Sequence, residues 1–157
     1  AGPPLPPELA PLRGALARAA APSPWILVDQ ARIDRFAACT GDDYWLHVDP
    51  ARARAEAPGG TTLAHGFLLL SLVAGPGSLH HAPLPGVQLV LNYGLERVRF
   101  VAPVAAGTRV RVATRLLDAT AKAPGRWLLR QQKTVEIERV ERPALVAEHL
   151  VLLQLSP

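Results

Sequence analysis

The second half of the chain contains four long stretches in which valine and leucine alternate with polar residues. Proline, glycine and short polar turns separate these stretches, which cover residues 86–104, 107–120, 126–140 and 144–155. A period of two turns the apolar side chains of a strand toward one face of a sheet, which can then pack on a core. Strands that follow one another through short turns pair antiparallel. The pattern therefore predicts a meander of four long strands in one antiparallel sheet.

One segment before these strands is apolar on almost every side. Residues 63–75, LAHGFLLLSLVAG, form a predicted helix that Thr61 or Thr62 can cap. A helix without a polar face belongs in the interior of a protein. Because 157 residues are enough for one domain, the helix and the strands predict a single α+β domain whose sheet wraps around the buried helix.

The first part of the chain contains shorter predicted elements. Residues 1–22 are predicted to be an N-terminal extension with a short helix over residues 7–20, and residues 23–157 to be the domain. Hydrophobic spacing predicts three further elements, a strand at 25–29 and helices at 31–39 and 50–57. Gly41 can end the first of these helices, and the Asp-Pro pair at 49–50 can start the second.

Composition excludes several classes of protein. No apolar run reaches the roughly 18 residues that a membrane-spanning helix needs, so we expect no membrane partner. Cys39 is the only cysteine, which rules out an intramolecular disulfide and favours a reducing cytoplasm. The net charge is +4, but the basic residues are spread along the chain and only 5% of residues are aromatic. We therefore expect no nucleic-acid partner, although a mildly basic surface suits a phosphate-bearing substrate.

The polar stretch GDDYWLHVDP, residues 41–50, contains the first candidate for chemistry. Asp42 and His47 would face different sides of a helix, so we expect them on a loop that can fold both side chains into one pocket. A carboxylate and an imidazole that converge can hold a water and transfer its protons. Tyr44 and Trp45 could exclude bulk solvent from that pocket. Alternatively, Asp42 caps a turn and His47 is a structural, partly buried histidine.

A second candidate is the triplet Ala64-His65-Gly66, near the start of the predicted buried helix. Free N–H groups at a helix start favour developing negative charge, and Gly66 would let a carbonyl group approach the backbone closely. This arrangement suits an oxyanion site for a thioester enolate. The alternative is that Gly66 relieves crowding and His65 is a structural hydrogen-bond donor. The pair His80-His81 has no acidic or cysteine partner nearby, so we predict no metal site and expect the pair on a loop.

Together these residues closely resemble the MaoC-like dehydratase family, also called hydratase 2. The resemblance lies in residues 33–53 and 59–73, and residues 91–111 are similar to the branch typified by nodulation protein N. It extends in order from Trp25 to Leu155.

The resemblance implies a hot-dog fold, in which a long central helix, here Leu63 to Val73, is wrapped by a curved antiparallel sheet, usually in a homodimer or higher homo-oligomer. It implies a hydratase or dehydratase of acyl-CoA or acyl-carrier thioesters, with no cofactor beyond that carrier. The family adds water to a trans-2-enoyl-CoA or removes it from the (R)-3-hydroxyacyl-CoA. The family's catalytic pair maps onto Asp42 and His47, and the backbone N–H expected to bind the thioester oxygen maps onto Gly66.

One departure from the family motif keeps other functions open. Tyr44-Trp45 stands where the commonest family motif has Asn-Pro, and even the nodulation-protein branch usually has Gln in place of Tyr44. A hot-dog thioesterase would share the fold and hydrolyse the same class of substrate. A non-catalytic acyl-thioester-binding module is a further alternative, in which Tyr44 and Trp45 block the water site.

Overall fold

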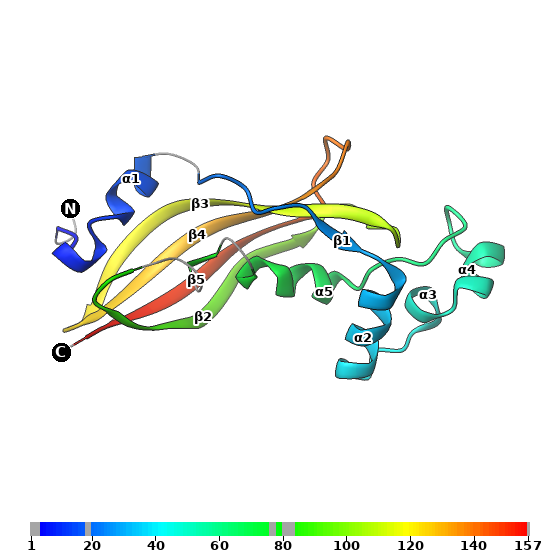
Figure 1. Cartoon of the computed structure of the whole chain (residues 1–157), viewed down its shortest axis with the longest axis horizontal. Helices are drawn as coiled ribbons and strands as arrows, with labels where there is room; N and C mark the ends of the chain where they lie inside the picture. Colours follow the sequence, from blue (N-terminus) through cyan, green and yellow to red (C-terminus); the bar gives the residue numbers. More distant parts are fainter. Residues whose placement is uncertain (1–3, 18–19, 76–77, 80–83, 157) are drawn as a thin grey trace.

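The computed structural model describes residues 4–17, 20–75, 78–79 and 84–156. Its main feature is a long, curved sheet of five antiparallel strands in the order β1-β3-β4-β5-β2 (Figure 1). The strands are β1 (Ile26–Val28), β2 (Val87–Phe100), β3 (Thr108–Ala123), β4 (Arg126–Ile137) and β5 (Leu145–Leu155). The four long strands predicted from the alternating pattern are therefore confirmed as β2 to β5.

The pairing of β2 differs from the predicted meander. Strands β3, β4 and β5 do pair in chain order, but β2 pairs with β5 rather than with β3, from Val87 opposite Leu155 to Phe100 opposite Leu145. The place beside β3 is taken by the short strand β1. Strand β2 thus forms one edge of the sheet.

The helices are η1 (Pro7–Leu9), α1 (Leu12–Ala17), α2 (Gln30–Thr40), α3 (Trp45–Val48), α4 (Pro50–Glu56), α5 (Gly66–Ser71) and η2 (Leu72–Ala74). The caps confirm the predicted C-terminus of α2 and the predicted N-terminus of α4. Gly41 ends α2 with a φ of 78°, in the left-handed region that favours glycine. Asp49 caps α4 by accepting a bond from the Arg52 N–H.

Two helices differ from their predictions. The single helix predicted over residues 7–20 is a 3-10 turn followed by α1, because Pro11 has no N–H and restricts the residue before it. The central helix begins at Gly66, not at Leu63, and His65 rather than a threonine is its N-cap. Residues 62–64 are held in an extended conformation instead, where the Ala64 N–H donates to the Val104 carbonyl at 2.8 Å.

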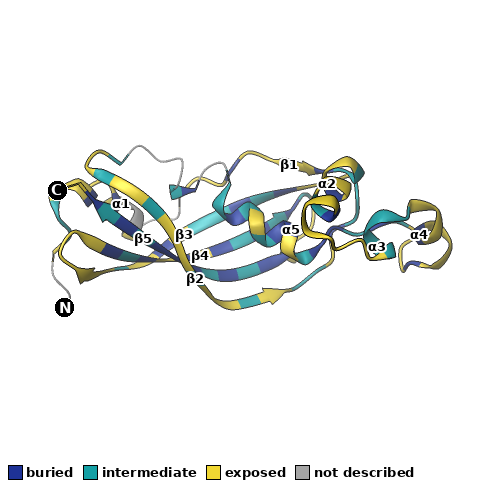
Figure 2. Ribbon diagram, turned by 90° about the horizontal axis from the view of Figure 1, so that it is seen from below, coloured by how far each residue is buried: buried dark blue, intermediate teal, exposed yellow. Residues whose placement is uncertain are grey.

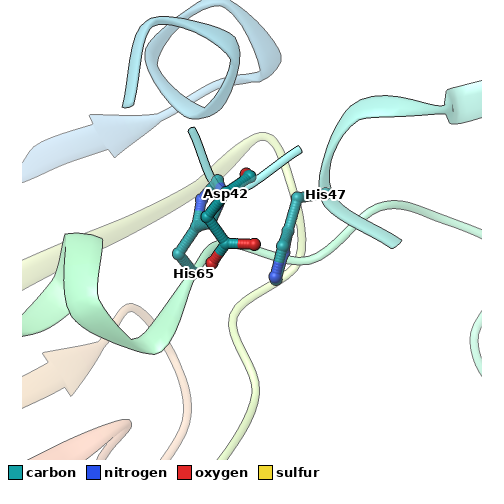
Figure 3. A group of neighbouring side chains, drawn as sticks. All are labelled: Asp42, His47 and His65. Atoms are coloured by element: carbon teal, nitrogen blue, oxygen red, sulfur yellow. The ribbon is translucent and has the colours of Figure 1, made fainter. Parts of the chain in front are cut away.

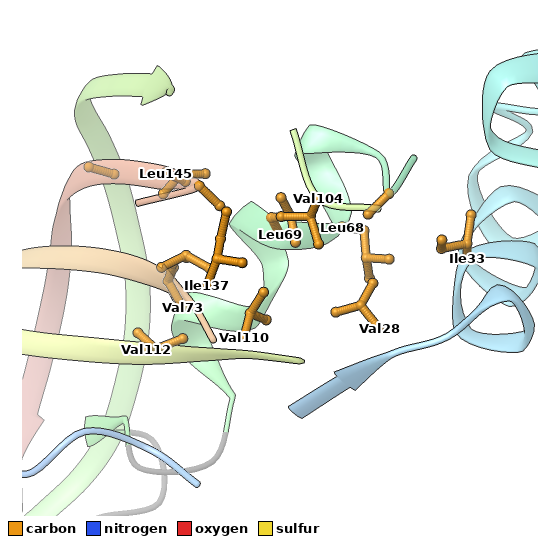
Figure 4. Packing of buried hydrophobic residues seen from close by; sticks show 14 residues of the cluster. Val28, Ile33, Leu68, Leu69, Val73, Val104, Val110, Val112, Ile137 and Leu145 are labelled. Carbon is orange, nitrogen blue, oxygen red and sulfur yellow. The ribbon is translucent and has the colours of Figure 1, made fainter. Parts of the chain in front are cut away.

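The core lies on one face of the sheet, in two clusters. Helix α5 packs on this face near one end, where its leucines meet valines of β1, β3 and β4 (Figure 4). At the other end η1 and α1 contribute the buried Leu9 and Leu12, which pack with Trp127 and Leu129. Buried residues alternate with exposed or half-buried ones along β4, and with half-buried ones along most of β5 (Figure 2). No helix among the described residues is long and apolar enough to cross a membrane.

Candidate active site

Three polar side chains from separate elements meet at the end of the sheet where α2, α3 and α4 gather (Figure 3). Asp42 follows the end of α2, His47 lies in α3, and His65 caps α5. One ligand atom from each of the three lies within 4.8 Å of those from the others. The structure therefore brings together the two residues predicted as a reactive pair and adds a third.

The local structure around His47 is more regular than predicted. His47 lies in the one-turn helix α3 and not on a loop, whereas Asp42 is in irregular backbone. The Leu63 N–H donates to the Leu46 carbonyl at 3.1 Å, and Gln30 Nε2 donates to the His47 carbonyl at 2.8 Å. These bonds tie α3 to the chain before α5 and to the start of α2.

One hydrogen bond determines how the His47 ring can act. Its Nδ1 lies 2.7 Å from the Leu63 carbonyl oxygen. A carbonyl oxygen only accepts, so Nδ1 must carry the proton of the neutral ring. This tautomer leaves the lone pair on His47 Nε2, where it can accept a proton from a water.

His65 supports both members of the pair. Its Nε2 lies 2.9 Å from the backbone carbonyl oxygen of Asp42 and must donate to it. The His65 ring stacks on the His47 ring, with centroids 3.9 Å apart, and its centroid lies 5.0 Å from that of Phe36. Only 1% of His65 is exposed, so the ring is enclosed rather than presented to a substrate.

The Asp42 side chain is on the surface of this cluster. The residue is exposed, and its carboxylate points toward the His47 ring in Figure 3. A carboxylate beside an imidazole lone pair offers two hydrogen-bond acceptors to one water molecule. The arrangement can orient a water and remove one of its protons, which is the requirement for general acid–base chemistry.

Asp42, His47 and His65 are also a set of residue types that can bind a metal ion. The two imidazole rings stack with only 26° between their planes. Lone pairs lie in the ring plane, so nearly parallel rings direct them side by side rather than at a common ion. This geometry suits a water better than a metal, and the predicted lack of a metal site stays a prediction. The pair His80-His81 lies outside the described residues.

The aromatic residues at the start of α3, Tyr44 and Trp45, have different surroundings. The Tyr44 ring meets the His47 ring edge-on at 6.0 Å, although 54% of Tyr44 is exposed. The Trp45 ring is covered by the Arg52 guanidinium, 4.3 Å from the ring centroid. Tyr44 is therefore the aromatic residue in contact with His47, and Trp45 packs on α4.

The residues of the triplet Ala64-His65-Gly66, at the start of α5, have distinct roles. The N–H of Ala64 is used in the bond to Val104, so it is not available to a substrate. Gly66 is the first residue of α5, where backbone N–H groups have no acceptor within the helix. A Cβ on Gly66 would lie 2.9 Å from the Phe100 ring, closer than such contacts occur. Glycine is therefore suited to this position by its lack of a side chain.

An apolar cavity of about 590 Å³ lies beside the cluster, between α5 and β2. Phe36 lines this cavity and its ring centroid lies 5.0 Å from that of His65, so the cavity borders the polar cluster at Phe36. Residues 92–94 line the cavity, and the pairing of β2 with β5 shifts register between Asn92 and Gly94. His149, which also lines the cavity, was missed, although a histidine within an apolar alternating strand was a visible signal.

Comparisons with known proteins identify the family of the chain. The MaoC like domain family matches residues 13–138. Nodulation protein N of Rhizobium leguminosarum bv. viciae is 42% identical over 138 residues, which cover 86% of this chain and 84% of that protein. The 3-hydroxyacyl-thioester dehydratase Z of Mycobacterium tuberculosis is 44% identical over 130 residues, which cover 82% of this chain and 84% of that protein.

Solved structures show the same architecture. An (R)-hydratase from A. caviae involved in PHA biosynthesis matches with a TM-score of 0.69 and 25% identity, covering 88% of this chain and 95% of that one. A MaoC-like dehydratase from Rhodospirillum rubrum matches with a TM-score of 0.69 and 25% identity, covering 87% of this chain and 90% of that one. The curved sheet around α5 is thus a hot-dog fold, and the chain belongs to the family of proteins with a MaoC-like domain.

Proposed function

We propose that the protein is a hydro-lyase that adds water to a trans-2-enoyl thioester or removes it from the (R)-3-hydroxyacyl thioester. The observation that carries the proposal is the meeting of the Asp42 carboxylate with the imidazole of His47, whose Nδ1 bond leaves Nε2 as the free base. The names of the dehydratase and hydratase relatives support the same reaction class.

The reaction then follows from the two hydrogen-bond acceptors. A water donates to the Asp42 carboxylate and to His47 Nε2, which directs its oxygen lone pair toward C3 of the substrate. As oxygen bonds to C3, His47 Nε2 takes one proton and the C2–C3 π electrons move toward the thioester oxygen. The protonated His47 Nε2 then delivers this proton to C2 of the enolate, which restores the neutral imidazole, and the thioester carbonyl reforms. The substrate carbonyl supplies the activation, so the proposed reaction requires no cofactor besides the acyl carrier.

The developing negative charge requires a donor, and we assign it to the N–H of Gly66. This group is at the first turn of α5, on a residue without a side chain. A single donor of this kind contributes about 10²–10³-fold to the rate in acyl-transfer enzymes. The acyl chain would extend into the 590 Å³ cavity, whose walls from α5 are mostly apolar.

We further propose that two copies of the chain associate through the edge strand β2. An exposed edge strand offers unpaired backbone groups to another strand. Several large apolar residues of β2 are 43–53% exposed, namely Leu89, Leu91, Tyr93, Leu95 and Phe100. Phe67 of α5 is 67% exposed, contrary to the burial predicted for all sides of that helix. Burial of these side chains in a homodimer would remove this apolar surface from water.

A cytoplasmic location is part of the proposal. Cys39 is a free and exposed cysteine. An exposed thiol persists in its reduced form in a reducing compartment.

The test is the ultraviolet absorbance of crotonyl-CoA with the wild-type protein, Asp42→Asn and Asp43→Asn, with thiol release followed in parallel. Asp43 is the matched control because it is an adjacent exposed carboxylate outside the cluster. We expect loss of the enoyl signal without thiol release, abolished by Asp42→Asn and retained by Asp43→Asn. Thiol release would indicate a thioesterase instead. Tight binding of acyl-CoA without turnover of either kind would indicate a binding module.

A further inference from the structure

We propose that His65 is a positioning residue, which holds Asp42 at the distance from His47 that the bound water requires. The inference rests on the proposed function, because it concerns the same water. The sequence left two roles open for His65, part of an oxyanion site or a structural hydrogen-bond donor, and the bond to Asp42 favours the donor.

The first observation is the bond from His65 to the chain of Asp42. Asp42 lies in irregular backbone directly after the left-handed Gly41, where no helix or strand ladder restrains it. The bond from His65 Nε2 to the Asp42 carbonyl, 2.9 Å long, connects this backbone to the start of α5. An exposed carboxylate on an irregular segment thereby acquires a defined position.

The second observation is the stack of the two histidines. The centroid of the His65 ring lies 3.9 Å from that of His47 and 5.0 Å from that of Phe36. His65 therefore restrains Asp42 through a hydrogen bond and His47 through van der Waals contact. Among the described residues, His65 thus contacts both members of the pair.

The third observation separates positioning from simple structural support. Within the described part of the chain, His65 Nδ1 has no hydrogen-bond partner, although it is buried. An unpaired buried polar atom is unfavourable for folding by about 1–3 kcal/mol. An apolar ring in the place of His65 would remove this unpaired atom. The Nε2–H donor is the feature that such a ring would lack.

The variants His65→Phe and His65→Gln separate the two contacts. Phenylalanine retains an aromatic ring against His47 but has no donor for the Asp42 carbonyl. Glutamine retains an N–H donor on a side chain of similar reach but has no ring. The matched control is Ser23→Ala, since the buried Ser23 hydroxyl also bonds to backbone, accepting from the Val112 N–H at 2.9 Å.

Kinetics with crotonyl-CoA and urea unfolding are measured for all four proteins. We expect His65→Phe to lower kcat about 10–100-fold, because displacements near 1 Å can reduce rates by that amount, with KM changed less than about threefold. His65→Gln should recover most of kcat, and Ser23→Ala should lose stability with kcat unchanged. Wild-type kcat in folded His65→Phe, or equal loss in His65→Phe and His65→Gln, would overturn the inference.

A second readout does not depend on turnover. The ¹³C shift of the Asp42 carbonyl reports the hydrogen bond that it accepts, and amide exchange at Asp43 reports the mobility of this backbone. His65→Phe should move the carbonyl shift and accelerate exchange, whereas His65→Gln and Ser23→Ala should not. An unchanged ¹³C shift of the Asp42 carbonyl in His65→Phe would overturn the inference, whether or not the wild-type protein hydrates enoyl-CoA. A lack of hydration by the wild-type protein would contradict only the proposed function.

Discussion

The ammonium group of Lys133 lies on the buried face of the sheet, 3.0 Å from the hydroxyl of Thr114 on the neighbouring strand β3. Lys133 has no exposed surface. It occupies a position on β4 between the inward-facing Gln131 and Val135, so its long side chain is enclosed by the core. Burial disfavours the charged form and lowers the pKa of Lys133 from 10.5 to about 8.

The lowered pKa of Lys133 predicts a stability that increases with pH. Below pH 8 both the folded and the unfolded chain carry the proton, and the folded state must bury the charge. Between about pH 8 and pH 10.5 the folded chain loses the proton while the unfolded chain keeps it. The free energy of unfolding should therefore increase over this window, by roughly 3 kcal/mol for a shift of this size.

Comparison with Lys133→Met isolates that effect from the titration of other groups. The difference in free energy of unfolding, wild type minus Lys133→Met, should increase from pH 8 to pH 10.5 in urea titrations. The exposed Lys122 provides the control, because Lys122→Met should give a difference that is nearly independent of pH. A constant difference for Lys133→Met would show that the lysine is not desolvated in the folded protein.

Asp42 and His47 should behave as one catalytic unit. If both hold the same water, Asp42→Asn and His47→Ala should each lower kcat by about 10²–10⁴-fold. The double variant should be about as slow as the slower single variant, because the second substitution removes a function already lost. Fully multiplicative losses would indicate that the two residues act on separate steps.

The left-handed backbone at Gly41 should matter for activity as well as for stability. Gly41 has a φ of 78° and Gly107 a φ of 88°, and a Cβ would meet nothing within 4 Å at either residue. Alanine at either position should lower stability by about 1 kcal/mol or more through backbone strain alone. Gly41→Ala should also lower kcat, because Asp42 follows it, whereas Gly107→Ala should not. Equal kcat in the two variants would argue against a positional requirement at Asp42.

The exposed face of β2 should determine the oligomeric state. Leu91→Lys, at a residue that is 45% exposed, should convert the proposed dimer to a monomer, because a charge cannot be buried without a partner. Leu117→Lys is the matched control, since Leu117 is 39% exposed on the interior strand β3. Light scattering after gel filtration gives the mass. A wild-type mass of 16.8 kDa, that of one chain, would exclude the dimer.

Local patterns in the sequence account for most of the elements. Alternation with a period of two located β2 to β5, because a strand with one buried face requires that pattern wherever it pairs. The caps at Gly41 and Asp49 were visible because each acts on the backbone only a few residues away. The same holds for the two candidate reactive residues, which lie in one short polar stretch.

Contacts between distant segments decided the rest. The apolar pattern of residues 63–65 is compatible with a helix, but bonds to residues 104–106 hold that segment extended and delay the start of α5. No local pattern in the sequence of β2 shows whether this strand pairs with β3 or with β5.

The sequence by itself thus determined the strands and the caps, because these depend on interactions between neighbours in the chain, and it predicted Asp42 and His47 as the candidate pair. Only the tertiary structure decided the pairing of β2, the tautomer of His47 and the place of His65. Each depends on a hydrogen bond or a packed face supplied by residues far away in sequence, and the free energy of such contacts exists only once the chain has folded.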